Sequence, residues 1–120
     1  MFIFLDPPKS VQLRGGTSKE AILGAISAPE GEEQRIQCLG VGGSPPPQLK
    51  WYLGDRELLT AHRTINPAGN VVSTIALQMS RTDHGKALRC SAEHPALTTI
   101  VDVKSFLDVQ CKHFLIHLSP

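Results

Sequence analysis

The amino-acid sequence predicts an all-β fold, arranged as a two-sheet Greek-key sandwich. Short segments that alternate apolar and polar residues recur along the chain, and clusters of Gly, Pro, Asn and Asp separate them. Two of these segments contain cysteines, Cys38 and Cys90, which lie 52 positions apart. The single tryptophan, Trp51, follows the first cysteine by 13 positions. Together these observations favour two packed sheets over a helical or mixed fold.

Length and composition indicate one globular domain. The chain has 120 residues, of which 41% are hydrophobic and 19% charged, which is typical of a folded domain rather than a disordered segment. The net charge is +1 and no run of Lys or Arg occurs. We therefore expect neither a nucleic-acid partner nor binding to an anionic membrane surface.

The first half of the chain contains signals for four strands. Residues 6–13 begin with two prolines and then alternate, which predicts an edge strand. Residues 21–26 are apolar and predict either a short strand or one turn of helix. Alternation over residues 35–38 predicts a strand that ends before a loop at residues 40–47, which is rich in Gly and Pro, and a further strand at 48–53.

The second half of the chain predicts weak pairing followed by three longer strands. A turn at residues 54–56 leads into residues 57–59 and 61–65, which we expect to pair weakly. Residues 71–79 alternate and are rich in β-branched side chains, which favour a strand over a helix. A corner at residues 80–85 separates this segment from strands at 87–92 and 101–109.

The alternation also predicts the core and the extent of the domain. Inward positions are assigned to Ile36, Leu49, Trp51, Leu77 and Leu88. The predicted domain covers residues 6–110, and residues 1–5 and 111–120 are predicted to be flanking segments, either linker or foreign sequence.

Three stretches resemble the C2-type domains of the immunoglobulin superfamily. They are GGSPPP at residues 42–47, LKWYLGD at residues 49–55 and DHGKALRCSAEHP at residues 83–95. These motifs are similar to those of nephrin-like, sidestep-like and nectin-like adhesion receptors of animals, and they most resemble the arthropod nephrin and sidestep relatives. One departure is that Leu88 stands two residues before the second cysteine, where many immunoglobulin domains have the tyrosine of the tyrosine corner. We expect a salt bridge from Asp83 to a base elsewhere in the sandwich, but the sequence identifies no partner for it.

The resemblance implies a disulfide between Cys38 and Cys90 that joins the two sheets, with Trp51 packed against it. Such a bridge would place the domain in an oxidising compartment, as part of a longer membrane-anchored chain at the cell surface. The alternative is three reduced cysteines in a cytosolic domain. Cys111 would remain, either as a free thiol or paired with a cysteine of a neighbouring domain or chain.

Adhesion domains of this superfamily often make contacts through the sheet that contains the segments around Trp51, Cys90 and residues 101–109. On that sheet the outward positions are predicted to include Lys50, Tyr52, Arg89 and Ser91. Tyr and Arg are enriched among the residues that dominate binding energy at interfaces. The alternative is an ordinary solvated face.

The sequence gives no support for an enzyme. It contains none of the motifs of serine hydrolases, zinc proteases or phosphate-binding loops, so we expect no cofactor and no small-molecule substrate. Cys111, His113 and His117 have a spacing that could bind zinc on a helix, but no second ligand pair accompanies them, and we predict no metal site.

Two functions remain open. The first is an extracellular recognition module of an adhesion, axon-guidance or synaptogenesis receptor. It would bind a protein partner, another immunoglobulin-superfamily receptor, on another cell and would pack against neighbouring domains of its own chain. The second is a structural spacer in a tandem-domain matrix or muscle protein. The disulfide state and binding to cell surfaces distinguish the two.

Overall fold

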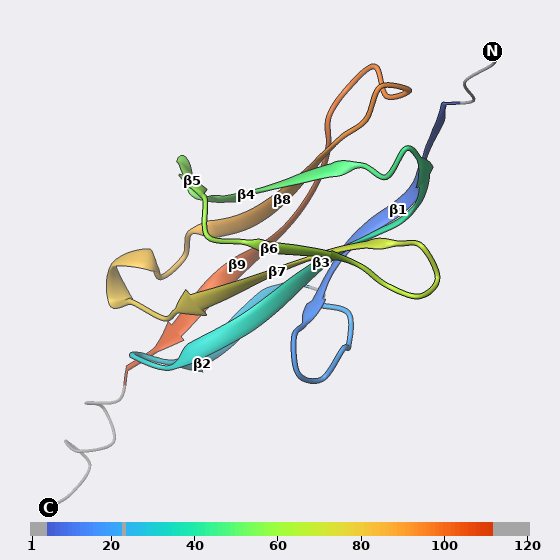
Figure 1. Cartoon of the computed structure of the whole chain (residues 1–120). Coiled ribbons are helices and arrows are strands. Elements are labelled where there is room, and N and C mark those ends of the chain that lie inside the picture. The colour runs from blue at the N-terminus through green and yellow to red at the C-terminus, as the bar shows by residue number, and fades with distance from the viewer. Residues whose placement is uncertain (1–4, 23, 112–120) are drawn as a thin grey trace, which may run out of the picture.

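Two β-sheets packed face to face form the molecule (Figure 1). The computed structural model describes residues 5–22 and 24–111. One sheet has four strands in the order β1-β3-β7-β6, and the other has five in the order β2-β9-β8-β4-β5. The predicted all-β sandwich is therefore confirmed. The strands are β1 (Asp6–Gly15), β2 (Ala25–Pro29), β3 (Glu33–Ser44), β4 (Gln48–Leu53), β5 (Arg56–Leu58), β6 (His62–Ile65), β7 (Val71–Gln78), β8 (Ala87–Glu93) and β9 (Val101–Gln110).

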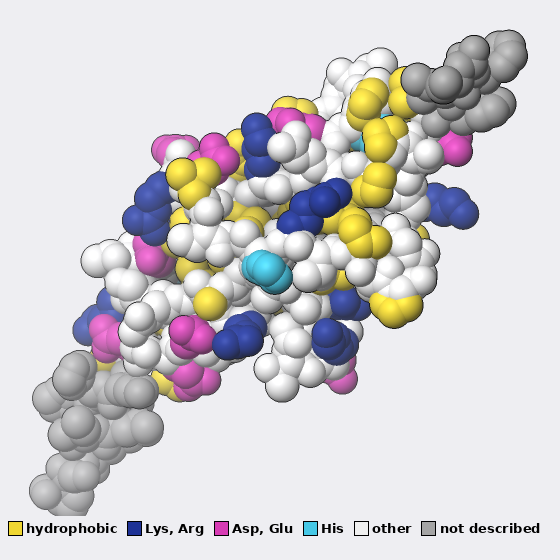
Figure 2. All heavy atoms as spheres, viewed as in Figure 1, with side chains coloured by type: hydrophobic (Ala, Val, Ile, Leu, Met, Phe, Trp, Pro, Cys, Tyr) yellow, Lys and Arg dark blue, Asp and Glu magenta, His cyan; other side chains and the backbone are white. Residues whose placement is uncertain are grey.

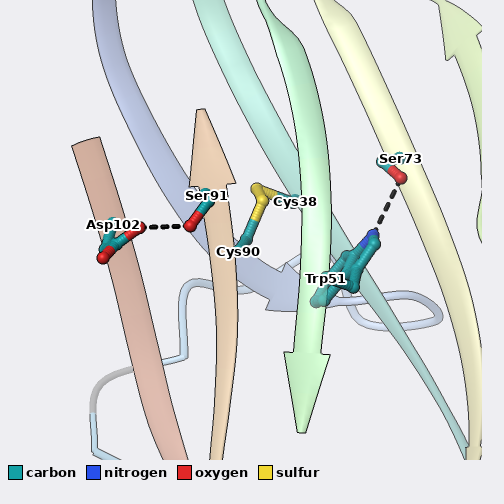
Figure 3. Close-up of a disulfide and its surroundings, with 6 residues drawn as sticks. All are labelled: Cys38, Trp51, Ser73, Cys90, Ser91 and Asp102. Carbon is teal, nitrogen blue, oxygen red and sulfur yellow. Dashed lines mark hydrogen bonds between the residues drawn. A yellow bond between two sulfur atoms is a disulfide. The ribbon is translucent and has the colours of Figure 1, made fainter. Parts of the chain in front are cut away.

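A disulfide and a tryptophan join the sheets at the centre of the sandwich (Figure 3). Cys38 on β3 is bonded to Cys90 on β8, and neither residue is exposed to solvent. Trp51 on β4 lies beside Cys90 of the neighbouring strand β8. Its indole N–H donates a 2.8 Å hydrogen bond to the hydroxyl of Ser73 on β7, in the opposite sheet. The tryptophan therefore buries its apolar ring and satisfies its one polar atom in the interior.

The predicted core positions lie where the two sheets face each other. Ile36, Trp51, Leu77 and Leu88 are buried, and Leu49 is partly buried against the same cluster. Alternation along each strand accounts for this arrangement, because successive side chains point to opposite faces of a sheet.

β3 is longer than the sequence predicts. The predicted loop at residues 40–47 is wrong over its first part, because β3 continues to Ser44 and stays paired with β1 to its end. Gly40 lies within the strand because the packing there leaves no room for a side chain: a Cβ would lie 2.9 Å from Cγ1 of Val71 and 3.1 Å from Cγ of Pro47. Glycine at this position permits close approach of neighbouring groups and is not a sign of a turn.

The second strand is also displaced from its predicted position. The expected strand over residues 21–26 is found at Ala25–Pro29, where β2 pairs in parallel with β9. Before it, Ala21 forms an isolated bridge with Arg14 of β1. The chain therefore pairs first with β1 of the four-stranded sheet and then with β9 of the five-stranded sheet. β2 begins only after the chain has crossed to the second sheet. The alternative of a helical turn is wrong for the residues of β2.

The corner between β7 and β8 is held by an ion pair in place of a tyrosine. A 3-10 turn, η1 (Arg81–Asp83), contains the buried Asp83, whose carboxylate lies 3.1 Å from Nζ of Lys86. The ion pair of Asp83 was expected, but its predicted location was wrong. The partner is not a base elsewhere in the sandwich but Lys86, three residues further along the chain.

His94 links two loops at one end of the sandwich. Its Nε2 lies 2.7 Å from the carbonyl oxygen of Pro45, and its Nδ1 accepts a 3.0 Å hydrogen bond from the backbone N–H of Ala96. The side chain is buried, so both ring nitrogens are satisfied within the protein. This contact fixes the loop after β3 against the loop after β8.

Among residues 5–22 and 24–111, no helix is long and apolar enough to cross a membrane.

Candidate interaction surface

The predicted interface residues lie together on the outer face of the five-stranded sheet. Strands β4, β8 and β9 lie side by side there, and the register places Tyr52 beside Arg89 and Arg89 beside Lys104. In the next row, Lys50 lies beside Ser91 and Ser91 beside Asp102. We call this set of rows the outer face.

Tyr52 and Arg89 form a stacked pair on the outer face. Cζ of Arg89 lies 4.6 Å from the centroid of the Tyr52 ring, within the range of a cation–π contact. Both side chains are partly exposed, so the pair is preorganised and still accessible from outside. The stack restricts two flexible side chains before any partner arrives, which lowers the entropy cost of binding.

Asp102 on β9 anchors the same pair from the other side. Nη1 of Arg89 lies 3.4 Å from Oδ2 of Asp102, and the hydroxyl of Ser91 donates a hydrogen bond to Oδ1 (Figure 3). Ser91 and Asp102 occupy a pair without backbone hydrogen bonds, in which side chains lie closest together.

Ser91 is the predicted residue that the structure removes from the accessible surface. It occupies an outer-face position, but it is only 5% exposed because its hydroxyl is turned to Asp102. Ser91 therefore offers little accessible surface, and its hydroxyl instead supports the Asp102 carboxylate that contacts Arg89. Lys50, the fourth predicted residue, lies 3.5 Å from Glu93, with both side chains partly exposed.

The structure adds residues of β9 that the predicted interface omitted. Phe106 is 50% exposed, and Nζ of Lys104 lies 5.7 Å from the centroid of its ring. The alternation of residues 101–109 in the sequence places Asp102, Lys104 and Phe106 on the face opposite the core, and this pattern would have been sufficient to include them. Phe106 lies one row from the stacked Tyr52–Arg89 pair, and exposed aromatic residues are enriched in protein interfaces.

Charges of both signs are interspersed over the surface. Figure 2 shows basic and acidic side chains mixed with apolar ones on the side turned to the viewer, without a large patch of one sign. With a net charge of +1, this pattern suits a protein partner better than a polyanion.

The zinc arrangement considered for the end of the chain falls mostly outside the described residues, since only Cys111 of that set is described. Cys111 is a free, partly buried thiol. In the part of the chain that the structure covers, no group of three His, Cys, Asp or Glu side chains is placed to bind a metal.

Comparison with known proteins identifies the family. Residues 20–100 match the model of the CD80-like C2-set immunoglobulin domain. The chain is 30% identical to mouse cell adhesion molecule 1 over 88 residues, which covers 72% of this chain and 19% of the relative. It is 31% identical to mouse nephrin over 87 residues, covering 69% of this chain and 7% of nephrin.

A solved structure supports the same family. The full ectodomain of mouse nectin-like molecule 4 superimposes with a TM-score of 0.68 and 26% identity, over 89% of this chain and 35% of that ectodomain. The chain thus spans a fifth or less of the curated relatives named above. The resemblance to nephrin-like and nectin-like proteins is confirmed, and the chain belongs to the immunoglobulin superfamily, as a C2-set domain related to cell adhesion molecules and nephrin.

Proposed function

We propose that this domain is an extracellular recognition module of a cell-adhesion receptor. It binds a protein partner on another cell, itself an immunoglobulin-superfamily receptor, through the outer face of the five-stranded sheet. The relatives in the comparison are adhesion proteins, which supports the general class. The module has no catalytic role in this proposal.

The observation that supports binding through the outer face is the stacked pair of Tyr52 and Arg89. The two residue types are among those most enriched at the energetic centre of interfaces, and here they contact each other one row from the exposed Phe106. The carboxylate of Asp102 contacts the guanidinium of Arg89, and the hydroxyl of Ser91 donates a hydrogen bond to that carboxylate. A partner that covers this pair would exclude water from an arginine whose charge is already matched.

The disulfide supports the proposed location. A Cys38–Cys90 bridge persists in an oxidising compartment and would be reduced in the cytosol. This argues against an intracellular muscle spacer more strongly than against a spacer in the extracellular matrix.

The proposal is tested by displaying the domain as a multimer and measuring its binding to cells that each express one immunoglobulin-superfamily ectodomain. Once a partner is found, Tyr52→Ala and Arg89→Ala should each weaken binding by about tenfold or more. Arg35→Ala is the matched control, because Arg35 is an exposed arginine on β3, in the opposite sheet, and its only ion-pair contact is with Glu33 at 3.9 Å among the described residues. The Arg35→Ala variant should bind the partner with the affinity of the wild type.

Two results would contradict the proposal. If no cell-surface partner is found although the disulfide-bonded domain is folded, the structural spacer becomes the better account. If a partner is found but Arg35→Ala weakens binding as much as Arg89→Ala, the domain binds through another surface.

A further inference from the structure

The acidic residues of β9 on the outer face are already engaged by the domain itself. Oδ2 of Asp102 lies 3.4 Å from Nη1 of Arg89, and the hydroxyl of Ser91 donates a hydrogen bond to Oδ1. Further along the strand, Oδ2 of Asp108 accepts a 2.9 Å hydrogen bond from the hydroxyl of Ser27 on β2. Both carboxylates are therefore occupied by groups on neighbouring strands.

Lys104 stands on β9 between these two acids, and its charge is not matched within the domain. The side chain is exposed, and it forms no ion pair among the described residues. Its Nζ lies instead 5.7 Å from the centroid of the Phe106 ring. A cation–π contact orients an ammonium group but leaves its charge in place. The unbalanced charge on the outer face of β9 is therefore positive.

Arg89 places a second cation next to Lys104, because the two residues are direct partners across β8 and β9. The N–H of Leu107 donates to the carbonyl of Lys86, and backbone bonding alternates along an antiparallel pair. The Arg89–Lys104 pair therefore lies at a position without backbone hydrogen bonds, where side chains are closest and like charges repel. An anion that contacts both cations would relieve this repulsion.

The guanidinium of Arg89 can take part in such a contact. It has five N–H donors, and its described contacts are one nitrogen near Asp102 and one face on the ring of Tyr52. Donors therefore remain for a further acceptor from outside. Hydrogen bonds between a guanidinium or an ammonium and a carboxylate are among the stronger ones in proteins.

Phe106 adds an apolar contact one row from the two cations. Its direct neighbours across the strands are Ala87 on β8 and Ala25 on β2. A single methyl group on each side is too short to cover an aromatic ring, so Phe106 remains 50% exposed. A partner that covers the ring would remove this apolar surface from water.

We propose that Lys104 and Phe106 select the partner, which presents an acidic side chain beside an apolar one at this place. The partner's carboxylate lies between Lys104 and Arg89, and its apolar side chain covers Phe106. This inference rests on the proposed function, since it names the chemistry that the partner offers to the outer face. A protein carboxylate fits better than a sulfated glycan, because Asp102 and Asp108 on either side would repel a polyanion.

The test uses surface plasmon resonance with the purified ectodomain that the cell-binding screen identifies. Lys104→Glu should weaken binding by about tenfold or more and Lys104→Gln by less, because the first change adds repulsion to the lost attraction. Phe106→Ala should also weaken binding by about tenfold. Added NaCl should weaken the binding of the wild type more steeply than that of Lys104→Gln, since salt screens the attraction.

Lys9→Glu is the matched control. Lys9 is an exposed lysine on β1, in the opposite sheet, and it forms no ion pair among the described residues. The change alters the net charge as much as Lys104→Glu does, but it should leave the affinity at the wild-type value. Reversal of one Asp or Glu of the ectodomain to Lys should restore binding to Lys104→Glu and weaken binding to the wild type.

Each opposite result would overturn the inference. If Tyr52→Ala loses binding while Lys104→Glu and Phe106→Ala bind as the wild type does, the proposed function stands and this inference is wrong. Equal losses for Lys9→Glu and Lys104→Glu would mean that only net charge matters. Binding to cells that heparinase treatment abolishes would assign the two cations to a sulfated glycan. If no ectodomain binds the folded domain, the proposed function fails and this inference fails with it.

Discussion

Trp51 connects the two sheets by a hydrogen bond. It pairs with Cys90 of the disulfide across β4 and β8, and its N–H donates to Ser73 across the interior. Neither Trp51 nor Ser73 has an alternative polar partner in water, because both are buried. The hydrogen bond therefore fixes one orientation of the tryptophan, and with it the spacing between β4 and β7.

Replacing Trp51 by Phe should lower the free energy of unfolding by about 2–4 kcal/mol. The change leaves a cavity and removes the partner of the Ser73 hydroxyl, and both effects are costly in a packed interior. Chemical denaturation measures the loss. Trp51→Phe combined with Ser73→Ala should recover part of it, because the unpaired hydroxyl is then also gone. No recovery would show that the hydrogen bond is not responsible.

Ser105 carries a polar atom that the described structure leaves unsatisfied. Its hydroxyl is buried on β9 and has no hydrogen-bond partner among the described residues. Ser105→Ala should therefore leave stability unchanged or raise it by up to about 1 kcal/mol, since no bond is lost and the cost of burying the hydroxyl disappears. A loss of stability in thermal unfolding would reveal a partner for this hydroxyl.

At the scale of single residues, the sequence was sufficient for the core and for the sheet face on which Tyr52 and Arg89 lie. Trp51 and Cys90 follow from spacing, and Tyr52 and Arg89 follow from alternation next to them. Ser91 could not be judged in this way, because its exposure depends on Asp102 in a neighbouring strand. Alternation determines the face of a residue but not which cross-strand neighbour covers it.

At the scale of elements, pairing between strands determined the bounds of β3 and β2, which the local sequence does not specify. β4 was predicted with its observed bounds because Pro47 and Gly54 stand directly on either side of it. β3 was predicted too short, because Gly40, Gly42 and Gly43 are typical of a loop, whereas in the structure β1 pairs alongside them. The start of β2 depends on its parallel partner β9, which lies about 80 positions later in the chain.

Gly40→Ala tests the close packing of Gly40 against Val71. The new methyl group would meet Cγ1 of Val71 at 2.9 Å, so we expect a loss of about 1–3 kcal/mol from overpacking. Thermal unfolding measures the loss, and Gly40→Ala combined with Val71→Ala should be less unstable than the two separate losses predict. Additive losses would mean that the two positions do not contact each other.

At the scale of the whole molecule, two sheets are held by one covalent bond and a small core. β1 starts at one end of the sandwich and β9 ends at the other (Figure 1), an arrangement that suits domains connected end to end.

Removing the disulfide by Cys38→Ala and Cys90→Ala together should lower the free energy of unfolding by about 2–5 kcal/mol. The bridge restricts the unfolded chain over a loop of 52 positions. Peptide mapping of unreduced secreted protein should show Cys38 joined to Cys90. Three free thiols in folded protein would contradict the proposed location outside the cell.

The most direct test of the proposed function compares Arg89→Ala with Arg35→Ala in binding to the partner on cells. Both changes remove one partly or fully exposed arginine from a strand, but only Arg89 belongs to the stacked pair on the outer face. We predict that Arg89→Ala weakens binding by about tenfold or more and that Arg35→Ala has no effect. Equal affinities for the two variants would contradict recognition through the outer face.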